Sequence, residues 1–131
     1  MKLDHVGIAV PSIPEALERW RPLLGPPAAP PEEVPGGIRV AFLSAGPTHI
    51  ELVEPTVPDS SVSKFLARGG GGLHHLAFAV PDVDRALAEV AARGGRLVDL
   101  KGRPGARGRR VGFAHPSAFE GVLVEYVEER P

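Results

Sequence analysis

The chain has 131 residues, of which 43% are hydrophobic and 24% charged, so it is long enough for one ordinary globular domain. Its formal net charge of −1 argues against nucleic acid or an anionic membrane as a partner, and no apolar run is long enough to cross a bilayer. Cysteine is absent, which excludes disulfides, thiolate metal sites and cysteine nucleophiles.

The first apolar stretch is short and stops at Pro11, which is typical of a strand and not of a signal peptide, so we expect a cytoplasmic protein. The first half should contain a strand at 3–10, a helix at 13–24, and strands at 28–34, 38–45 and 48–54. Ser12 stands where the helix cap should be. The proline-rich stretch GPPAAPP at 25–31 breaks the helix and should leave the following strand poorly formed.

The segment VPDSSVSKFLARGGGG at 57–72 predicts a short linker helix, capped by Asp59 or Ser60 and ended by its glycine run. After this linker, the same order of predicted strands and helix occurs again. The second half should contain a strand at 74–80, a helix at 83–93, and strands at 96–101, 109–114 and 121–127. Asp82 stands at the second cap position.

This return is an internal sequence repeat. DHVGIAVPSIPEALERW at 4–20 aligns without a gap with HHLAFAVPDVDRALAEV at 74–90, and RVAF and IELVE match RVGF and VEYVE in the same order. We therefore predict an α+β fold in which two tandem βαβββ modules form a cupped, barrel-like mixed sheet. The whole chain, 1–131, should be one domain, with repeats at 1–56 and 73–131 joined by the linker 57–72.

The alignment pairs two histidines and two glutamates. His5 and His75 open the first strands of the two copies, and Glu51 and Glu125 lie in the last strands. Two imidazoles and two carboxylates at equivalent positions suit one divalent ion and leave coordination positions open. The alternative is that each glutamate faces solvent and each histidine is a surface residue, because strand periodicity does not decide which face is polar.

The other histidines and the basic residues have weaker patterns. His74 should point away from the side of His75, His49 has no counterpart in the second copy, and His115 ends a strand. The segment KGRPGARGRR at 101–110 could bind phosphate or be a solvated basic hairpin. Ser60 and Lys64 on the linker are a further pair of candidate ligands for an anionic substrate group.

Several of these motifs together resemble a known family. HVGIAV, HHLAFAV, IELVEP and VLVEYVE resemble the vicinal oxygen chelate superfamily, which includes glyoxalase I. Within it, DSSVSKFL, GGGGLHHLAFAV, GARGRRVGFAHP and GVLVEY are similar to the methylmalonyl-CoA epimerases. The chain departs from that family in reading VPGGI where many members have an EQGV stretch, and GARG where they have GAHG.

The resemblance implies that His5, His75 and Glu125 bind one divalent metal ion (Co, Mn, Ni, Zn or Mg), with Glu51 at the remaining position. It also implies an acyl-CoA or similar thioester as the small-molecule substrate, inversion of the carbon α to its carbonyl, and a homodimer. Glu51 is the expected acid/base group, and Glu125 the second catalytic residue, chiefly as a ligand. The expected substrate-binding residues are Ser60, Lys64, Arg107 and His115.

Other functions are compatible with the same motifs. A glyoxalase I-like lyase acting on a thiol hemithioacetal would use the same four ligands. A metal-free binding protein of the drug-resistance type would not need the histidine and glutamate quartet. A ring-cleaving dioxygenase would need two histidines and one carboxylate, which leaves one glutamate surplus.

Overall fold

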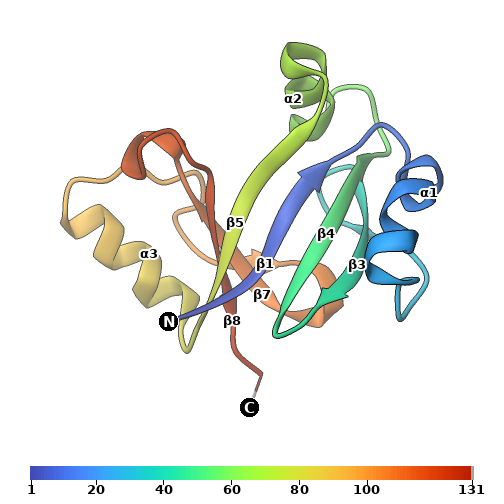
Figure 1. The fold of residues 1–131 in the computed structure, drawn as a ribbon. Coiled ribbons are helices and arrows are strands. Elements are labelled where there is room, and N and C mark those ends of the chain that lie inside the picture. The colour runs from blue at the N-terminus through green and yellow to red at the C-terminus, as the bar shows by residue number, and fades with distance from the viewer. Residues whose placement is uncertain (131) are drawn as a thin grey trace. The chain divides into compact units, whose positions relative to one another are not determined.

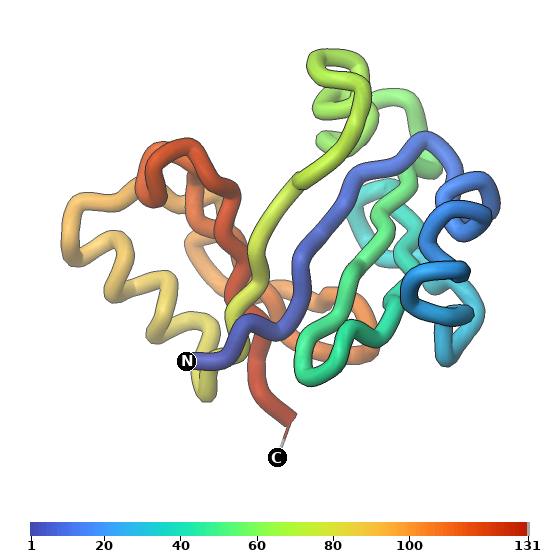
Figure 2. The backbone as a smooth tube through the Cα atoms, viewed as in Figure 1, coloured from blue at the N-terminus to red at the C-terminus, as the bar shows by residue number. Residues whose placement is uncertain are grey.

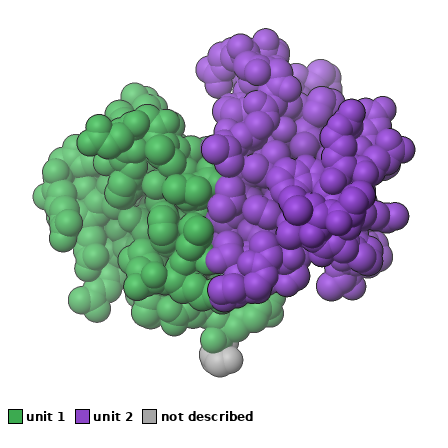
Figure 3. Space-filling view, viewed as in Figure 1, with its two compact units in different colours: residues 1–4, 75–131 green, residues 5–74 purple. Residues whose placement is uncertain are grey.

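Each half of the chain has the predicted order of a strand, a helix and three further strands, as the computed structural model shows for residues 1–130 (Figure 1). The chain divides into two compact units (Figure 3). Unit 1 comprises residues 1–4 and the chain from His75 on, and unit 2 comprises residues 5–74. Among residues 1–130, no helix is long and apolar enough to cross a membrane.

Unit 2 contains the first repeat and the linker helix. Its elements are β1 (Lys2–Ala9, which starts in unit 1), α1 (Ile13–Leu24), β2 (Glu32–Val34), β3 (Ile38–Ala45), β4 (Thr48–Pro55) and α2 (Ser61–Gly69). Its strand order is β2-β3-β4-β1, with β1 parallel to β4 and the other neighbours antiparallel. Ser60 caps α2 and Gly70 ends it, as predicted; Figure 2 traces α2 as the connection from β4 to β5.

Unit 1 repeats this arrangement with the second half of the chain. Its elements are β5 (Gly72–Val80, which starts in unit 2), α3 (Val83–Ala92), β6 (Arg103–Pro104), β7 (Arg110–Ala114) and β8 (Val124–Glu128), with short 3-10 turns at Ala106–Gly108 and Pro116–Ala118. Its strand order is β5-β8-β7-β6, with β5 parallel to β8. The pairing is therefore the same in both units.

In each unit the helix covers one face of its strands and forms an apolar core there (Figure 1). Ile13 and Leu17 of α1 pack against residues of β3 and β4, and Val83 and Leu87 of α3 pack against residues of β8. Ser12 and Asp82 accept hydrogen bonds from backbone amides in the first turns, as predicted. Apolar side chains three or four residues apart thus turn one helix face toward the sheet.

A second repeated glutamate lies at or next to the end of each last strand and binds the helix of the same half. Glu54 Oε2 accepts a hydrogen bond from Ile13 N at 2.6 Å, and Glu128 Oε2 accepts one from Val83 N at 3.1 Å. A carboxylate at this place complements the partial positive charge of a helix N-terminus. Because Glu54 is three residues from Glu51, the motif IELVE places one carboxylate on each face of the sheet.

Two predicted strands differ from the structure. The strand expected at 28–34 forms only at Glu32–Val34, since Pro30 and Pro31 have no amide hydrogens to donate. The prediction of a strand at 96–101 is wrong. Leu97 makes one isolated bridge, to Ala114, and β6 begins later, at Arg103.

Two unusual sets of hydrogen bonds replace the strand at 96–101. The amides of Val98 and Asp99 both donate to the Phe113 carbonyl, at 3.0 and 3.1 Å, a pattern that a regular ladder does not have. The Asp99 carboxylate accepts from Phe113 N at 2.9 Å. The chain therefore bends here, held by a side chain in place of a backbone partner.

Replacing Leu87 by Ala should lower the free energy of unfolding by about 2 to 5 kcal/mol, because a fully buried side chain leaves a cavity. Leu87 is 0% exposed, and it packs so closely on β7 that a Cβ added at Gly112 would lie 2.7 Å from its Cδ1. Urea denaturation measures the change. Leu100→Ala is the control, since Leu100 is 82% exposed, and an equal loss in both variants would contradict the packing described above.

Candidate metal centre

In unit 2, a histidine, a glutamate and a phenylalanine from three neighbouring strands form one half-site. His5 Nε2 on β1 lies 3.4 Å from Glu51 Oε1 on β4, and both residues are buried. In the strand register Glu51 lies between Gly7 and Phe42. The Phe42 ring stands edge-on to the His5 ring, with centroids 5.4 Å apart. These contacts restrict the orientation of the imidazole.

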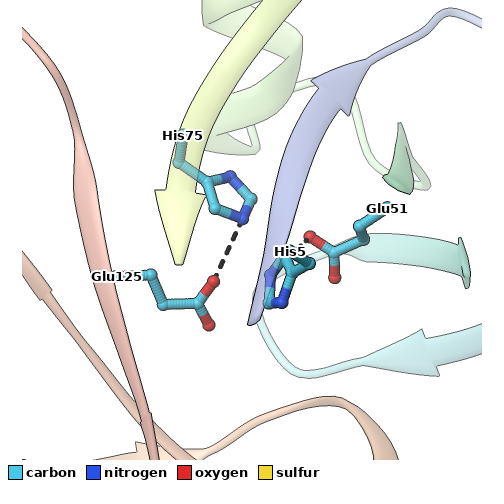
Figure 4. A group of neighbouring side chains, drawn as sticks. All are labelled: His5, Glu51, His75 and Glu125. Atoms are coloured by element: carbon cyan, nitrogen blue, oxygen red, sulfur yellow. Dashed lines mark ion pairs between the residues drawn. The ribbon is translucent and has the colours of Figure 1, made fainter. Parts of the chain in front are cut away.

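In unit 1, the same three residue types occupy equivalent positions. His75 Nε2 on β5 lies 3.0 Å from Glu125 Oε1 on β8, and both residues are buried. Glu125 lies between Ala77 and Phe113 in the register. The Phe113 ring stands edge-on to the His75 ring, with centroids 5.6 Å apart. The sequence repeat is thus a repeat of side-chain geometry, and both pairs are drawn in Figure 4.

The residues of the two half-sites suit a divalent metal ion. Each half-site offers one imidazole nitrogen and one carboxylate. Imidazole and carboxylate are the ligands of borderline and hard divalent ions, and no thiolate is present to favour a soft ion. Two buried carboxylates are also costly without positive charge, which a divalent cation would supply.

The surrounding structure shows which face of the strand each glutamate occupies. His5, Gly7 and Glu51 share the face opposite to α1, because Ile8 and Leu52 of the same strands lie in the core that α1 covers. The solvent-facing alternative for Glu51 and Glu125 is wrong, since these residues are only 6% and 7% exposed. Phe42 and Phe113 also belong to these half-sites. The aligned motifs RVAF and RVGF both end in phenylalanine, and this repetition could have identified them from the sequence.

The predicted substrate-binding residues have different surroundings. Ser60 is buried, and its hydroxyl accepts from Ser63 N at 3.1 Å as the cap of α2. Lys64 is exposed on the same helix. His115 Nδ1 accepts from Ser117 N at 3.0 Å, so one ring nitrogen is used locally. Arg107 has a left-handed backbone, with φ 58°, and its guanidinium lies 3.7 Å from Asp4.

The remaining two histidines lie near phenylalanines. His74 packs edge-on against Phe65 of α2, with centroids 4.9 Å apart, and His49 lies edge-on to Phe42 at 6.3 Å. His49 is paired with His5 in the register of β1 and β4. Neither residue is one of the four that make up the candidate metal-binding set.

The basic segment 101–110 is largely neutralised by ion pairs. Arg103 pairs with Asp99, Arg109 with Asp4, and Arg110 with Asp84, at 3.0, 2.9 and 2.8 Å. A hydrogen bond from the Gly102 amide, followed by one from Arg110, lowers the pKa of Asp84. Most of these arginines therefore anchor the segment to its own unit and do not form a free cationic patch.

Comparisons with known proteins agree with this geometry. A family model described as the glyoxalase/bleomycin resistance protein/dioxygenase superfamily matches residues 4–113. An ethylmalonyl-CoA/methylmalonyl-CoA epimerase of Cereibacter sphaeroides is 37% identical, with 95% of each chain covered.

Two solved structures are also similar over nearly the whole chain. A methylmalonyl-CoA epimerase in complex with methylmalonyl-CoA and NH4+ has a TM-score of 0.90 and 36% identity, covering 98% of this chain and 94% of its own. A variant of the Streptomyces coelicolor methylmalonyl-CoA epimerase in complex with 2-nitronate-propionyl-CoA has a TM-score of 0.91 and 35% identity, covering 100% and 99%. These similarities confirm the predicted α+β fold of the glyoxalase type.

Proposed function

Because the chain belongs to the glyoxalase/bleomycin resistance protein/dioxygenase superfamily, we propose that it catalyses the epimerisation of methylmalonyl-CoA. The observation that carries this proposal is the repeated, buried pair of a histidine and a glutamate, at 3.4 Å in unit 2 and 3.0 Å in unit 1. Relatives of this chain that are named for this reaction are similar to it over nearly their whole length.

One divalent ion is proposed to be held by His5, His75 and Glu125, with Glu51 at the remaining ligand position. The donor types and their burial support this assignment. Such an ion, when bound, supplies positive charge to the oxygen of a developing enolate. Cobalt, manganese, nickel, zinc and magnesium are all compatible with two imidazoles and two carboxylates.

The proton transfer itself is assigned to the glutamates. The carbon α to a thioester is a weak acid, so a base must be placed against its hydrogen. Glu51 is the proposed base, and Glu125 is proposed chiefly as a ligand of the metal. Inversion requires the proton to leave one face and return to the other, and we assign the second face to Glu125.

The test is an assay of the purified chain, supplied with a divalent metal, on one epimer of methylmalonyl-CoA in deuterium oxide. We expect formation of the other epimer together with deuterium at the α carbon. The hemithioacetal of methylglyoxal and glutathione is assayed in parallel. Turnover of the hemithioacetal without exchange in methylmalonyl-CoA would favour a lyase, and inactivity with no bound metal would favour a binding protein.

Three further expectations stay predictions. The chain should act as a homodimer, which size-exclusion chromatography with light scattering tests. It should be one domain over 1–131, so both units should unfold in one transition. A cytoplasmic location also stays an expectation.

A further inference from the structure

We propose that Arg103 binds an oxyanion of the acyl-CoA substrate and is a specificity-determining residue of unit 1. This inference rests on the proposed function, which supplies the class of substrate. An acyl-CoA of the malonyl type has two kinds of oxyanion, the free carboxylate of its acyl group and the phosphates of coenzyme A. Both would be recognised by the same planar pair of guanidinium N–H groups.

The strand register places Arg103 on the face of the sheet that contains the half-site of unit 1. Arg103 is paired with Val111, and Val111 is paired with Val127. Glu125 lies two residues before Val127 on β8 and is paired with Phe113. Since paired residues share a face and every second residue returns to it, Arg103, Phe113 and Glu125 belong to one face.

The guanidinium of Arg103 is held in place next to that half-site. Its Nε donates to Asp99 Oδ1 at 3.0 Å, and the other oxygen of Asp99 accepts from Phe113 N at 2.9 Å. The central carbon of the guanidinium lies over the Phe113 ring, 5.3 Å from its centroid, a cation–π contact. The same ring stands edge-on to His75. Asp99 and Phe113 thus orient the cation beside a proposed metal ligand.

The end of the Arg103 side chain is available for a ligand. The side chain is 42% exposed, and within residues 1–130 its two terminal nitrogens donate no hydrogen bond. Arg109 and Arg110 differ, because their terminal nitrogens donate to Asp4 and Asp84. Arg103 therefore has an oriented pair of donors with room for an oxyanion.

The repeat shows that the fold itself does not require an arginine here. The equivalent position in unit 2 is Glu32. It is paired with Val40, and Val40 is paired with Val53, which repeats the pairing described for Arg103. The two halves thus have opposite charges at one register position. A malonyl thioester is also unsymmetrical, with an anionic carboxylate at one end and a neutral thioester at the other. A cation in unit 1 alone would favour the anionic end there.

The test is the binding of malonyl-CoA and acetyl-CoA to the metal-loaded full chain, measured by titration calorimetry. Acetyl-CoA has the same phosphates and lacks the carboxylate. Arg103→Gln should weaken binding of malonyl-CoA by about tenfold or more, the effect of losing a charge-assisted hydrogen bond. Arg85→Gln is the control, since Arg85 is an exposed residue of α3 paired with Glu89, and it should leave both affinities unchanged.

The two sources of oxyanion give different results. If Arg103 binds the carboxylate, Arg103→Gln weakens the binding of malonyl-CoA and leaves the binding of acetyl-CoA unchanged. If Arg103 binds a phosphate, the substitution weakens the binding of both esters equally. Affinities of both esters within about twofold of the wild type would overturn the proposal, since a factor of two is too small for such a contact. If Arg103→Gln does not fold, Arg103→Lys decides, because lysine keeps the charge without the planar fork. Malonyl-CoA binding by Arg103→Lys equal to that of the wild type would then overturn it.

The same proteins separate this inference from the proposed function. If the wild type exchanges the α proton of methylmalonyl-CoA and Arg103→Gln binds both esters as the wild type does, the role of Arg103 alone would be overturned. In an active wild type, Arg103→Gln should raise KM more than it lowers kcat, since the residue binds substrate and moves no proton. A wild type without exchange and without affinity for either ester would overturn both proposals.

Discussion

Glu51→Gln should lower the rate of α-proton exchange in methylmalonyl-CoA by about 100- to 10,000-fold while the chain still binds its metal, because a general base contributes a factor of this size. The amide of glutamine nearly keeps the shape of the carboxylate and can still offer an oxygen to a metal, but it cannot accept a proton. Exchange of deuterium from solvent, followed by mass spectrometry, measures the rate. Metal content of the purified variant is measured on the same sample.

Two further variants serve as comparisons for Glu51→Gln. Glu125→Ala should lose both metal and activity, since it removes the carboxylate that lies 3.0 Å from His75 and is proposed as a ligand. Glu33→Gln removes a charge from the exposed strand β2 and should change neither. Unchanged deuterium incorporation in Glu51→Gln would remove Glu51 from the role of base, and loss of metal in that variant would make it chiefly a ligand.

His75→Ala should abolish tight metal binding and, with it, epimerisation. One imidazole of the four-residue set is removed, and Glu125, which is 7% exposed, loses its partner. Metal that binds only the folded chain also stabilises it, so addition of a divalent ion should raise the melting temperature of the wild type and not that of the variant. Thermal unfolding with and without added metal, together with elemental analysis, measures both effects.

The chain provides a matched control at the neighbouring position. His74 is the same residue type on the same strand, but it packs against Phe65 of α2. His74→Ala should keep the metal and the metal-dependent rise in melting temperature. Equal loss of metal in both variants would mean that the effect of His75→Ala comes from damage to β5 and not from loss of a ligand.

Much of the architecture and of the candidate site could be read from the repeat in the sequence. A duplicated module places matching residues at matching positions, so the alignment of His5 with His75 and of Glu51 with Glu125 identified the four candidate metal ligands. The helix caps Ser12 and Asp82 followed from local hydrogen bonding, which depends on a few neighbouring residues. Local and duplicated features are thus accessible to sequence analysis.

The features that sequence analysis missed depend on contacts between distant residues. The strand expected at 96–101 fails because Asp99 binds the backbone of Phe113, 14 residues away. The glutamates of IELVE separate into one that faces His5 and one that binds the N-terminus of α1, 41 residues away.

By itself, then, the sequence determined the modules, their order and the residue types of the candidate metal site. Only the tertiary structure decided which sheet face each carboxylate occupies and which arginine keeps its terminal nitrogens available. The physical reason is that periodicity records how side chains alternate along a strand, whereas the partner of a charged group is chosen by strand pairing and helix packing.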